Sequence, residues 1–463
     1  MYNSKFIQIW SEFNKAEQNR FYRFVHSPYH NKHEEVKSLL DYCQTHERTD
    51  WAAAWDFIYP NSNYNDAKIR NLLSYLQKLL DKFLVYELLE QDDLQSSTLL
   101  LQAYRKRKTQ KAFDGAMRYA QLQLEKTPLR DAEYYFWEYK LQSESDIHQE
   151  QRNPMKARNL QEVHDSFETY YLAKKLHLAV AALAHQAIFK TEYRVDNIEA
   201  VLDLARQVPY RDIPAIALYY YCYLAQTEPE NESHFFKLKT QLLKHLHLFP
   251  TQELKGLFIV AINYCIRQMN KGEERYTLEI FDLYKEGLNL GVFIENQEIS
   301  RFTYKNIVST GLKLREFEWT KDFITNYAPF LAFEHRQTNL DYNLAKYYYI
   351  TGQYEDAMQL LLTLQSDDLS INLGARVTLL KIYYELEEWQ PLESLVESFG
   401  AFVRRNKAMS EYHKKSYKNL LRFVQKLLNY NFYDAKEREK LRLAIQTEEG
   451  LPERDWLLER LEK

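Results

Sequence analysis

One pattern of apolar and small residues occurs twice in tandem within residues 341–399, at a spacing of thirty-five positions. The first copy contains Leu344, Ala345, Tyr348, Gly352, Tyr354, Ala357 and Leu361. The second copy contains Leu379, Leu380, Tyr383, Glu387, Trp389, Leu392 and Val396. A fixed period of this length is typical of stacked two-helix units, none of which buries its apolar face alone. The pattern therefore predicts an array of antiparallel helical hairpins.

The scarcity of turn-forming residues extends this prediction to the whole chain. Glycine occurs 10 times and proline 11 times in 463 residues, which is roughly a third of the usual glycine share and half of the usual proline share. Folds rich in strands need more of both, because their turns consume them. We therefore expect an all-α protein, an α-solenoid of antiparallel helical hairpins with a helical N-terminal domain.

The spacing of the proline- and glycine-containing breaks between the expected helices divides the chain into three parts. We expect a helical N-terminal domain over residues 1–94, irregular helical hairpins over 95–300, and regular repeats over 301–463. A weaker copy of the pattern, around Ile307 and Gly311, precedes the two clear ones. The last part should end in a degenerate C-terminal cap, because a terminal unit needs one polar outer face.

Two segments of the N-terminal domain have the spacing of a helix-capping box, in which a polar residue is followed three positions later by Glu or Gln. They are Asn14-Lys-Ala-Glu17 and Asn31-Lys-His-Glu34. A turn is expected at Pro60-Asn-Ser-Asn63, followed by a long amphipathic helix that starts near Asn65.

Charge and cysteine usage exclude several classes of protein. The net charge of −4 and the pI of about 6.4 argue against a generic electrostatic attraction to nucleic acid or anionic membranes. The three cysteines lie far apart, which fits buried thiols in a reducing compartment. Residues 1–30 lack a signal-peptide core and no apolar run approaches the roughly 20 residues of a membrane span. We therefore expect a cytoplasmic protein without membrane contact.

Residues 338–399 resemble tetratricopeptide repeats through Leu344, Ala345, Tyr348, Gly352, Tyr354, Ala357 and Leu361. The resemblance implies helix pairs whose first helices line a groove for an extended peptide. Carried over to this sequence, the principal groove residues are Tyr342, Asn343, Lys346, Tyr349, Lys381 and Tyr384. The weaker preceding unit would add Lys305, Asn306 and Ser309.

Lysines and tyrosines on such a wall could bind acidic side chains and stack along a peptide. The partner would then be another protein or a peptide segment. The alternative is that these residues form an ordinary solvated helix face.

A second resemblance concerns the N-terminal domain. Phe24-Val-His-Ser-Pro-Tyr29, Tyr64-Asn-Asp66 and Ile69-Arg-Asn-Leu72 are similar to segments of uncharacterised large helical proteins of bacteria. This resemblance implies a bacterial, intracellular origin and no particular activity.

The alternative function is that of a nucleic-acid-associated regulator. The densest basic run is Arg105-Lys-Arg-Lys108, followed by Lys111. The helix from Asn65, which would lead with Lys68, Arg70 and Asn71, follows a turn in the manner of a helix-turn-helix. Core packing and solvated helix ends are the simpler explanation of both features.

Sequence patterns of metal sites and catalysis are weak or missing. His26, His30 and His33 lie within eight residues, but Ser27-Pro28 interrupts them and ordinary surface histidines are the simpler interpretation. The chain has no GxGxxG, GxxxxGK[ST], HExxH or GxSxG motif. We therefore expect no enzyme, no cofactor and no metal, and a non-catalytic adaptor or scaffold instead.

Overall fold

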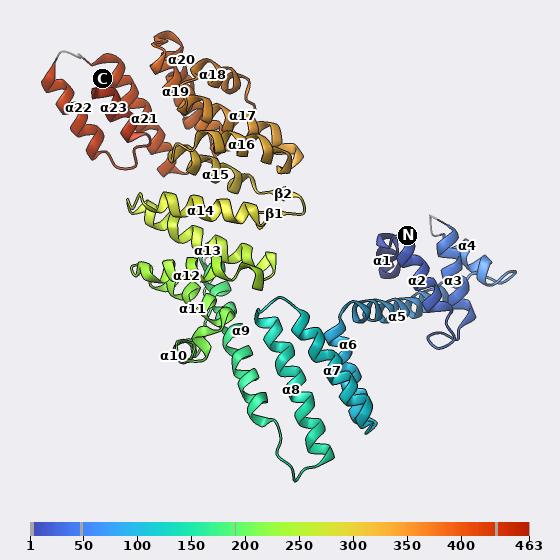
Figure 1. The fold of residues 1–463 in the computed structure, drawn as a ribbon. Helices are drawn as coiled ribbons and strands as arrows, with labels where there is room; N and C mark the ends of the chain where they lie inside the picture. Colours follow the sequence, from blue (N-terminus) through green and yellow to red (C-terminus); the bar gives the residue numbers. More distant parts are fainter. Residues whose placement is uncertain (1–3, 47–49, 190, 431–433, 463) are drawn as a thin grey trace. The chain divides into compact units, whose positions relative to one another are not determined.

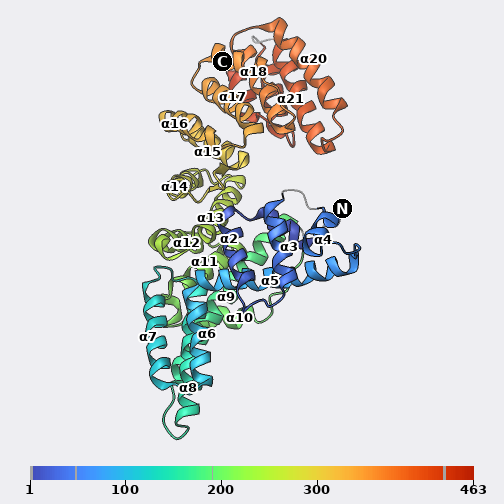
Figure 2. The ribbon, with the colours of Figure 1, turned by 90° about the vertical axis from the view of Figure 1, so that its right-hand side faces the viewer.

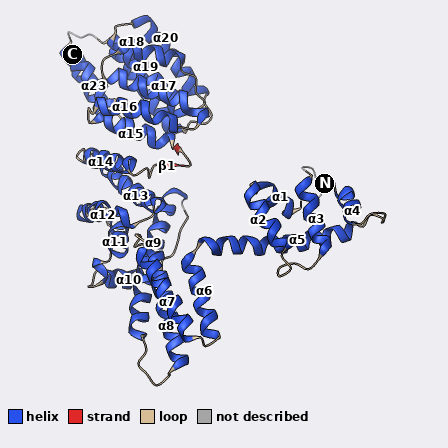
Figure 3. Ribbon diagram, turned by 45° about the vertical axis from the view of Figure 1, so that its right-hand side comes forward, coloured by secondary structure: helices blue, strands red, loops and turns tan. Residues whose placement is uncertain are grey.

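The computed structural model describes residues 4–46, 50–189, 191–430 and 434–462. Within these ranges the chain forms 23 α-helices, three short 3-10 helices and one two-stranded hairpin (Figure 3). The prediction of an all-helical chain whose neighbouring helices pack together is confirmed. Internal contacts divide the chain into two units, Met1–Tyr220 with His247–Phe249, and Tyr221–Leu246 with Pro250–Lys463.

The first unit contains ten complete α-helices among its described residues and the first half of an eleventh. They are α1 Lys5–Glu12, α2 Lys15–His26, α3 Glu34–Thr45, α4 Trp51–Ile58, α5 Asp66–Gln91, α6 Asp93–Lys106, α7 Gln110–Lys126, α8 Ala132–Arg152, α9 Leu160–Phe189, α10 Ile198–Ala205 and, across the division, α11 Pro214–Thr227. The 3-10 helices η1 Tyr210–Asp212 and η2 Leu246–Leu248 lie beside them in the sequence.

Helices α1, α2 and α3 pack against α5, and α4 packs against α3. The fully buried side chains of this core include Phe6, Phe21, Leu39 and Leu80. The first predicted capping box is confirmed, because the Asn14 side chain accepts from the backbone of Glu17 and the Glu17 carboxylate accepts from the backbone of Asn14. The expected turn and the helix that follows Asn65 are also confirmed.

The second predicted capping box is wrong. Helix α3 begins after His33, and no side chain caps its first turn. Asn31 is buried and uses its amide to accept from the backbone of His33 and to donate to the Val25 carbonyl at 3.1 Å. The side chain therefore closes the loop between α2 and α3, a contact to an earlier element that local spacing cannot show.

The second unit contains the remaining helices and the hairpin. They are α12 Glu232–Lys244, α13 Thr251–Asn270, α14 Tyr276–Asn289, β1 Ile294–Glu295, β2 Glu298–Ile299, α15 Arg301–Lys313, α16 Phe317–Tyr327, η3 Ala328–Phe330, α17 Phe333–Ile350, α18 Tyr354–Thr363, α19 Leu369–Glu385, α20 Trp389–Arg405, α21 Glu411–Asn429, α22 Ala435–Thr447 and α23 Arg454–Glu462. Figures 1 and 2 show the helices from α13 to α20 packed side by side.

The packing of the second unit follows a regular order. Helices α13 and α14, α15 and α16, α17 and α18, and α19 and α20 each pair with one another. Helix α17 also contacts the first helices of the two neighbouring pairs, α15 and α19. The three hairpin positions expected from the sequence pattern therefore correspond to three packed helix pairs.

Equivalent turns join the two helices of these pairs. Gly272, Arg315, Gly352 and Glu387 all have left-handed backbone conformations, with φ between 58° and 96°. In each turn the following residue donates its backbone N–H to a carbonyl five positions earlier, as Gln353 does to Tyr348 at 2.8 Å and Glu388 to Tyr383 at 2.9 Å. This is a glycine-type helix C-cap, formed here by glycine twice and by a charged residue twice.

Candidate binding face

The residues predicted to line a groove lie on α17 and α19, on the surface that also includes one side of α13 and α15. We call this surface the first-helix face. Contacts connect its parts, because Lys346 of α17 reaches Ser309 of α15, and Lys381 of α19 lies over the ring of Tyr349 on α17. The face has two stretches with different surroundings, one covered and one open.

Tyr342 and Asn343 are both buried between helices. The Tyr342 hydroxyl occupies the space beside Gly374 of α19, where a β-carbon would come within 2.0 Å of it. The Asn343 amide donates to the Asn339 carbonyl at 2.8 Å, and its Oδ1 has no hydrogen-bond partner among the described residues. Tyr342 therefore joins α17 to α19, Asn343 bonds within α17, and neither side chain is open to a ligand in this structure.

Lys346 lies at the centre of the face. Its Nζ donates to Ser309 Oγ at 3.0 Å. Removal of the ammonium group from water lowers the pKa of Lys346 to about 8, and the positive charge of Lys305 acts in the same direction. Lys381 adds to this effect, and only Glu453 opposes it. Lys346 is therefore a cation held in a predominantly cationic environment.

Lys381, Tyr349 and Tyr384 are brought together under residues from the end of the chain. Lys381 Nζ lies 2.7 Å from Glu453 Oε2 and 5.0 Å from the centre of the Tyr349 ring. The Tyr384 ring meets Trp456 edge to face at 5.3 Å. Burial raises the pKa of Tyr384. These three predicted residues share one site, and the site is covered.

The cover is the C-terminal segment, which we define as residues 451–462, comprising α23 and the loop before it. Trp456 Nε1 donates to Glu385 Oε1 at 3.2 Å, and Arg460 forms an ion pair with Glu385 Oε2 at 2.8 Å. Trp456 is 6% exposed. Glu385, Glu453 and Trp456 are the residues that our sequence reasoning missed. The one local signal that could have indicated them is a tryptophan, Trp456, in the first turn of the charged helix α23.

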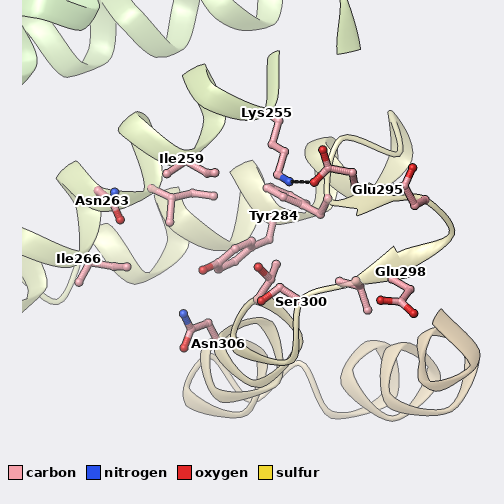
Figure 4. Close-up of a pocket in the computed structure, with 14 residues that line it drawn as sticks. Lys255, Ile259, Asn263, Ile266, Tyr284, Glu295, Glu298, Ser300 and Asn306 are labelled. Atoms are coloured by element: carbon pink, nitrogen blue, oxygen red, sulfur yellow. Dashed lines mark hydrogen bonds and ion pairs between the residues drawn. The ribbon is translucent and has the colours of Figure 1, made fainter. Parts of the chain in front are cut away.

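The open stretch lies between α13 and α15. Here a pocket of about 490 Å³ is bordered by both helices, by Tyr284 of α14 and by the β1–β2 hairpin (Figure 4). Its apolar lining includes Ile259, Ile266 and Phe293, and two exposed amides, Asn263 and Asn306, belong to its lining. The pocket thus combines apolar side chains and neutral hydrogen-bonding groups with the charged side chains of Lys255, Glu295 and Glu298 at its border.

The hairpin forms one wall of this pocket. Ile294 pairs with Ile299 and Glu295 pairs with Glu298. The two residues between the strands, Asn296 and Gln297, both have left-handed backbones, with φ of 50° and 65°, as a two-residue hairpin turn requires. An ion pair of 2.6 Å between Lys255 and Glu295 ties the wall to α13 (Figure 4). This hairpin was not expected from the sequence.

The basic run and the helix from Asn65 have structural partners of their own. Arg105 forms an ion pair with the buried Glu144 at 3.0 Å. Arg70 pairs with Asp66 at 2.6 Å, and Lys68 Nζ lies 3.8 Å above the Tyr59 ring. These contacts hold three of the cations that could have faced a phosphate backbone.

The N-terminal histidines lie against aromatic rings. His26 stacks on Tyr22 and lies 3.3 Å from Asp41, and His30 stacks on Phe24. Among the residues described by the structure, no group of three or more His, Cys, Asp or Glu is placed to hold a metal ion.

No protein family, curated protein or solved structure matches the chain. None of the helices in the described ranges combines the length and the apolar character needed to cross a membrane.

Proposed function

We propose that this protein is a non-catalytic, cytoplasmic adaptor or scaffold, built as a tetratricopeptide-like α-solenoid that holds a segment of a partner protein on its first-helix face. The four equivalent turns at Gly272, Arg315, Gly352 and Glu387 support a repeated hairpin unit. Repeats of this kind present long continuous surfaces, which suit extended or helical ligands.

The observation that carries the proposal is the open pocket between α13 and α15. An apolar side chain of a partner can enter between Ile259 and Ile266, where it would lose contact with water. The amides of Asn263 and Asn306 can each donate to a carbonyl and accept from an N–H of the partner backbone. The pocket therefore has the two components of peptide recognition, an apolar anchor site and main-chain hydrogen bonds.

The chemistry of the cysteines supports a non-catalytic role. All three are buried and unpaired. Burial raises the pKa of Cys43 and of Cys265 to about 12, so their thiolate forms are scarce at neutral pH. A thiol in this state is a poor nucleophile.

The proposal is tested by selecting peptides from a displayed library with the purified full chain and measuring their affinity by fluorescence anisotropy. Ile259→Asp, which places a charge in the pocket, should weaken binding of the selected peptides by about tenfold or more. Leu278→Asp on α14, where the leucine is 55% exposed and outside the pocket, should leave their affinity unchanged. Equal affinities for the two variants would reject the pocket as the binding site.

A further inference from the structure

The covered stretch contains more positive charge than its cover neutralises. Lys346 is influenced by Lys305, Lys381 and Glu453. Glu453 forms its ion pair with Lys381, and Lys305 donates to Ser370 Oγ at 2.7 Å. Within the described residues Lys346 has a hydroxyl partner and no carboxylate at ion-pair distance. The ammonium group of the half-buried Lys346 therefore lacks a partner of opposite charge within these residues.

The C-terminal segment also fits this stretch imperfectly. The Nε atom of Arg460 is buried without a hydrogen-bond partner among the described residues, while the other two guanidinium nitrogens bond to Glu385 and Glu459. Glu453 holds a left-handed backbone conformation, with φ of 55°, which is unfavourable for a residue with a side chain. Buried polar atoms without partners and strained residues both weaken an interaction.

We propose that the C-terminal segment is a displaceable occupant of a second binding stretch on α17 and α19, and that the ligand it stands in for is a helical segment of a partner protein. This inference rests on the proposed function, because it assigns a further ligand to the same first-helix face. The segment shows what the stretch accepts. A carboxylate meets Lys381, an aromatic ring three residues later meets Tyr384, and a guanidinium four residues after that meets Glu385.

A better partner would carry an additional carboxylate for Lys346. Trp456 and Arg460 are four residues apart in α23 and so lie on one side of the helix, and the Glu453 carboxylate comes from the turn directly before it. Glu385 disfavours a nucleic acid here, since its carboxylate would repel a phosphate backbone. The ligand class is thus an amphipathic, acidic helix with one aromatic anchor.

The test uses a fluorescent peptide of residues 450–462 as the probe and the full chain as the receptor. In the wild-type chain the attached segment occupies the stretch and competes with the probe. Only the fraction of chains whose segment has come off can bind the probe, which weakens the apparent affinity. Glu453→Lys places a cation against Lys381 and should release the attached segment. We expect the probe to bind this variant at least about tenfold more tightly than the wild-type chain. Adding Lys381→Glu should abolish this gain in probe affinity. Adding Lys313→Glu, at the end of α15 and away from the covered stretch, breaks the ion pair of Lys313 with Glu274 and should preserve the gain.

Circular dichroism establishes that each variant is folded, and Glu453→Gln replaces Glu453→Lys if the latter unfolds. Equal probe affinities for the wild-type and released chains would show that the segment is a permanent cap, which overturns the inference. Light scattering should show that the released variant is a monomer. A dimer in which each C-terminal segment binds the other chain would identify a second copy of this chain as the ligand and would overturn the inference. If the probe binds Glu453→Lys no more tightly than wild type, while Ile259→Asp still weakens the peptides selected for the pocket, the second stretch is rejected and the proposed function stands.

Discussion

The open and covered stretches of the first-helix face are built from the same kind of helix pair but differ in what lies on them. Between α13 and α15 a pocket is lined by apolar side chains and exposed amides, with Lys255, Glu295 and Glu298 also in its lining. On α17 and α19 it is cationic and lies under α23. The comparison teaches that similar helix pairs can carry surfaces of different chemistry, one open and one covered by a few residues of the C-terminal segment.

The largest expected difference between the two stretches concerns stability. Trp456→Ala should lower the free energy of unfolding by about 3–5 kcal/mol, because it empties a buried aromatic site. Ile259→Ala in the open stretch should change the free energy of unfolding by less than about 0.5 kcal/mol, since Ile259 is 41% exposed. Urea titrations measure both values. Equal effects would mean that the two stretches are equally buried.

The second prediction concerns Lys346 and pH. Its pKa of about 8 in the folded chain is below the usual 10.5. Between these values the unfolded chain binds more protons, so the stability of the wild-type chain rises with pH. Lys346→Met should therefore be more stable than wild type by about 2–3 kcal/mol at pH 7, because one pKa unit corresponds to about 1.4 kcal/mol. The difference should narrow by pH 9.5.

Denaturation of both chains at pH 7.0, 8.5 and 9.5 measures this difference. Lys313→Met is the control, because Lys313 is 46% exposed at the end of α15. A difference between wild type and Lys346→Met that is constant with pH would contradict the lowered pKa of Lys346, whose largest cause is burial of the ammonium group.

The third prediction concerns the helix pair beneath the covered stretch. Ala357 is fully buried in the core of the second unit. Ala357→Leu should destabilise this unit by about 1–3 kcal/mol through overpacking. Leu362→Ala, on the exposed side of the same helix, is the matched control. An unchanged thermal midpoint for Ala357→Leu would argue against close packing of this pair.

The smallest expected effects on stability concern the turns after α15 and α19, and they should be equal in the open and the covered stretch. Arg315→Gly and Glu387→Gly each remove a side chain from a left-handed turn, which should stabilise the chain by about 0.5–1 kcal/mol per site. Gly352→Ala, at the equivalent turn, should be destabilising. Thermal melts measure all three. Unequal gains for Arg315→Gly and Glu387→Gly would show that the hairpin units differ in more than their surfaces.

The periodic pattern was sufficient to predict the helix pairs, because the spacing around Gly352 and Glu387 reflects local hairpin packing. The resemblance to tetratricopeptide repeats, and not the periodicity itself, grouped Tyr349, Lys381 and Tyr384, which the structure brings together. It could not reveal their cover, since Glu453 lies 72 positions from Lys381 and such a contact leaves no local spacing.

The β1–β2 hairpin escaped prediction for a different reason. Its strands contain two residues each, too few to show alternation between apolar and polar positions. Its turn residues, Asn296 and Gln297, lack the glycine that usually marks such a turn. The pocket wall therefore depends on a feature that sequence patterns resolve poorly.

Hydrogen–deuterium exchange of the full chain, with and without a peptide selected by the open pocket, tests the central claim most directly. The account predicts added protection in residues 255–266 and 294–306 on peptide binding, with exchange in 369–385 and 454–462 unchanged. Protection confined to 369–385, with none at 255–306, would contradict the division of the face into an open and a covered stretch.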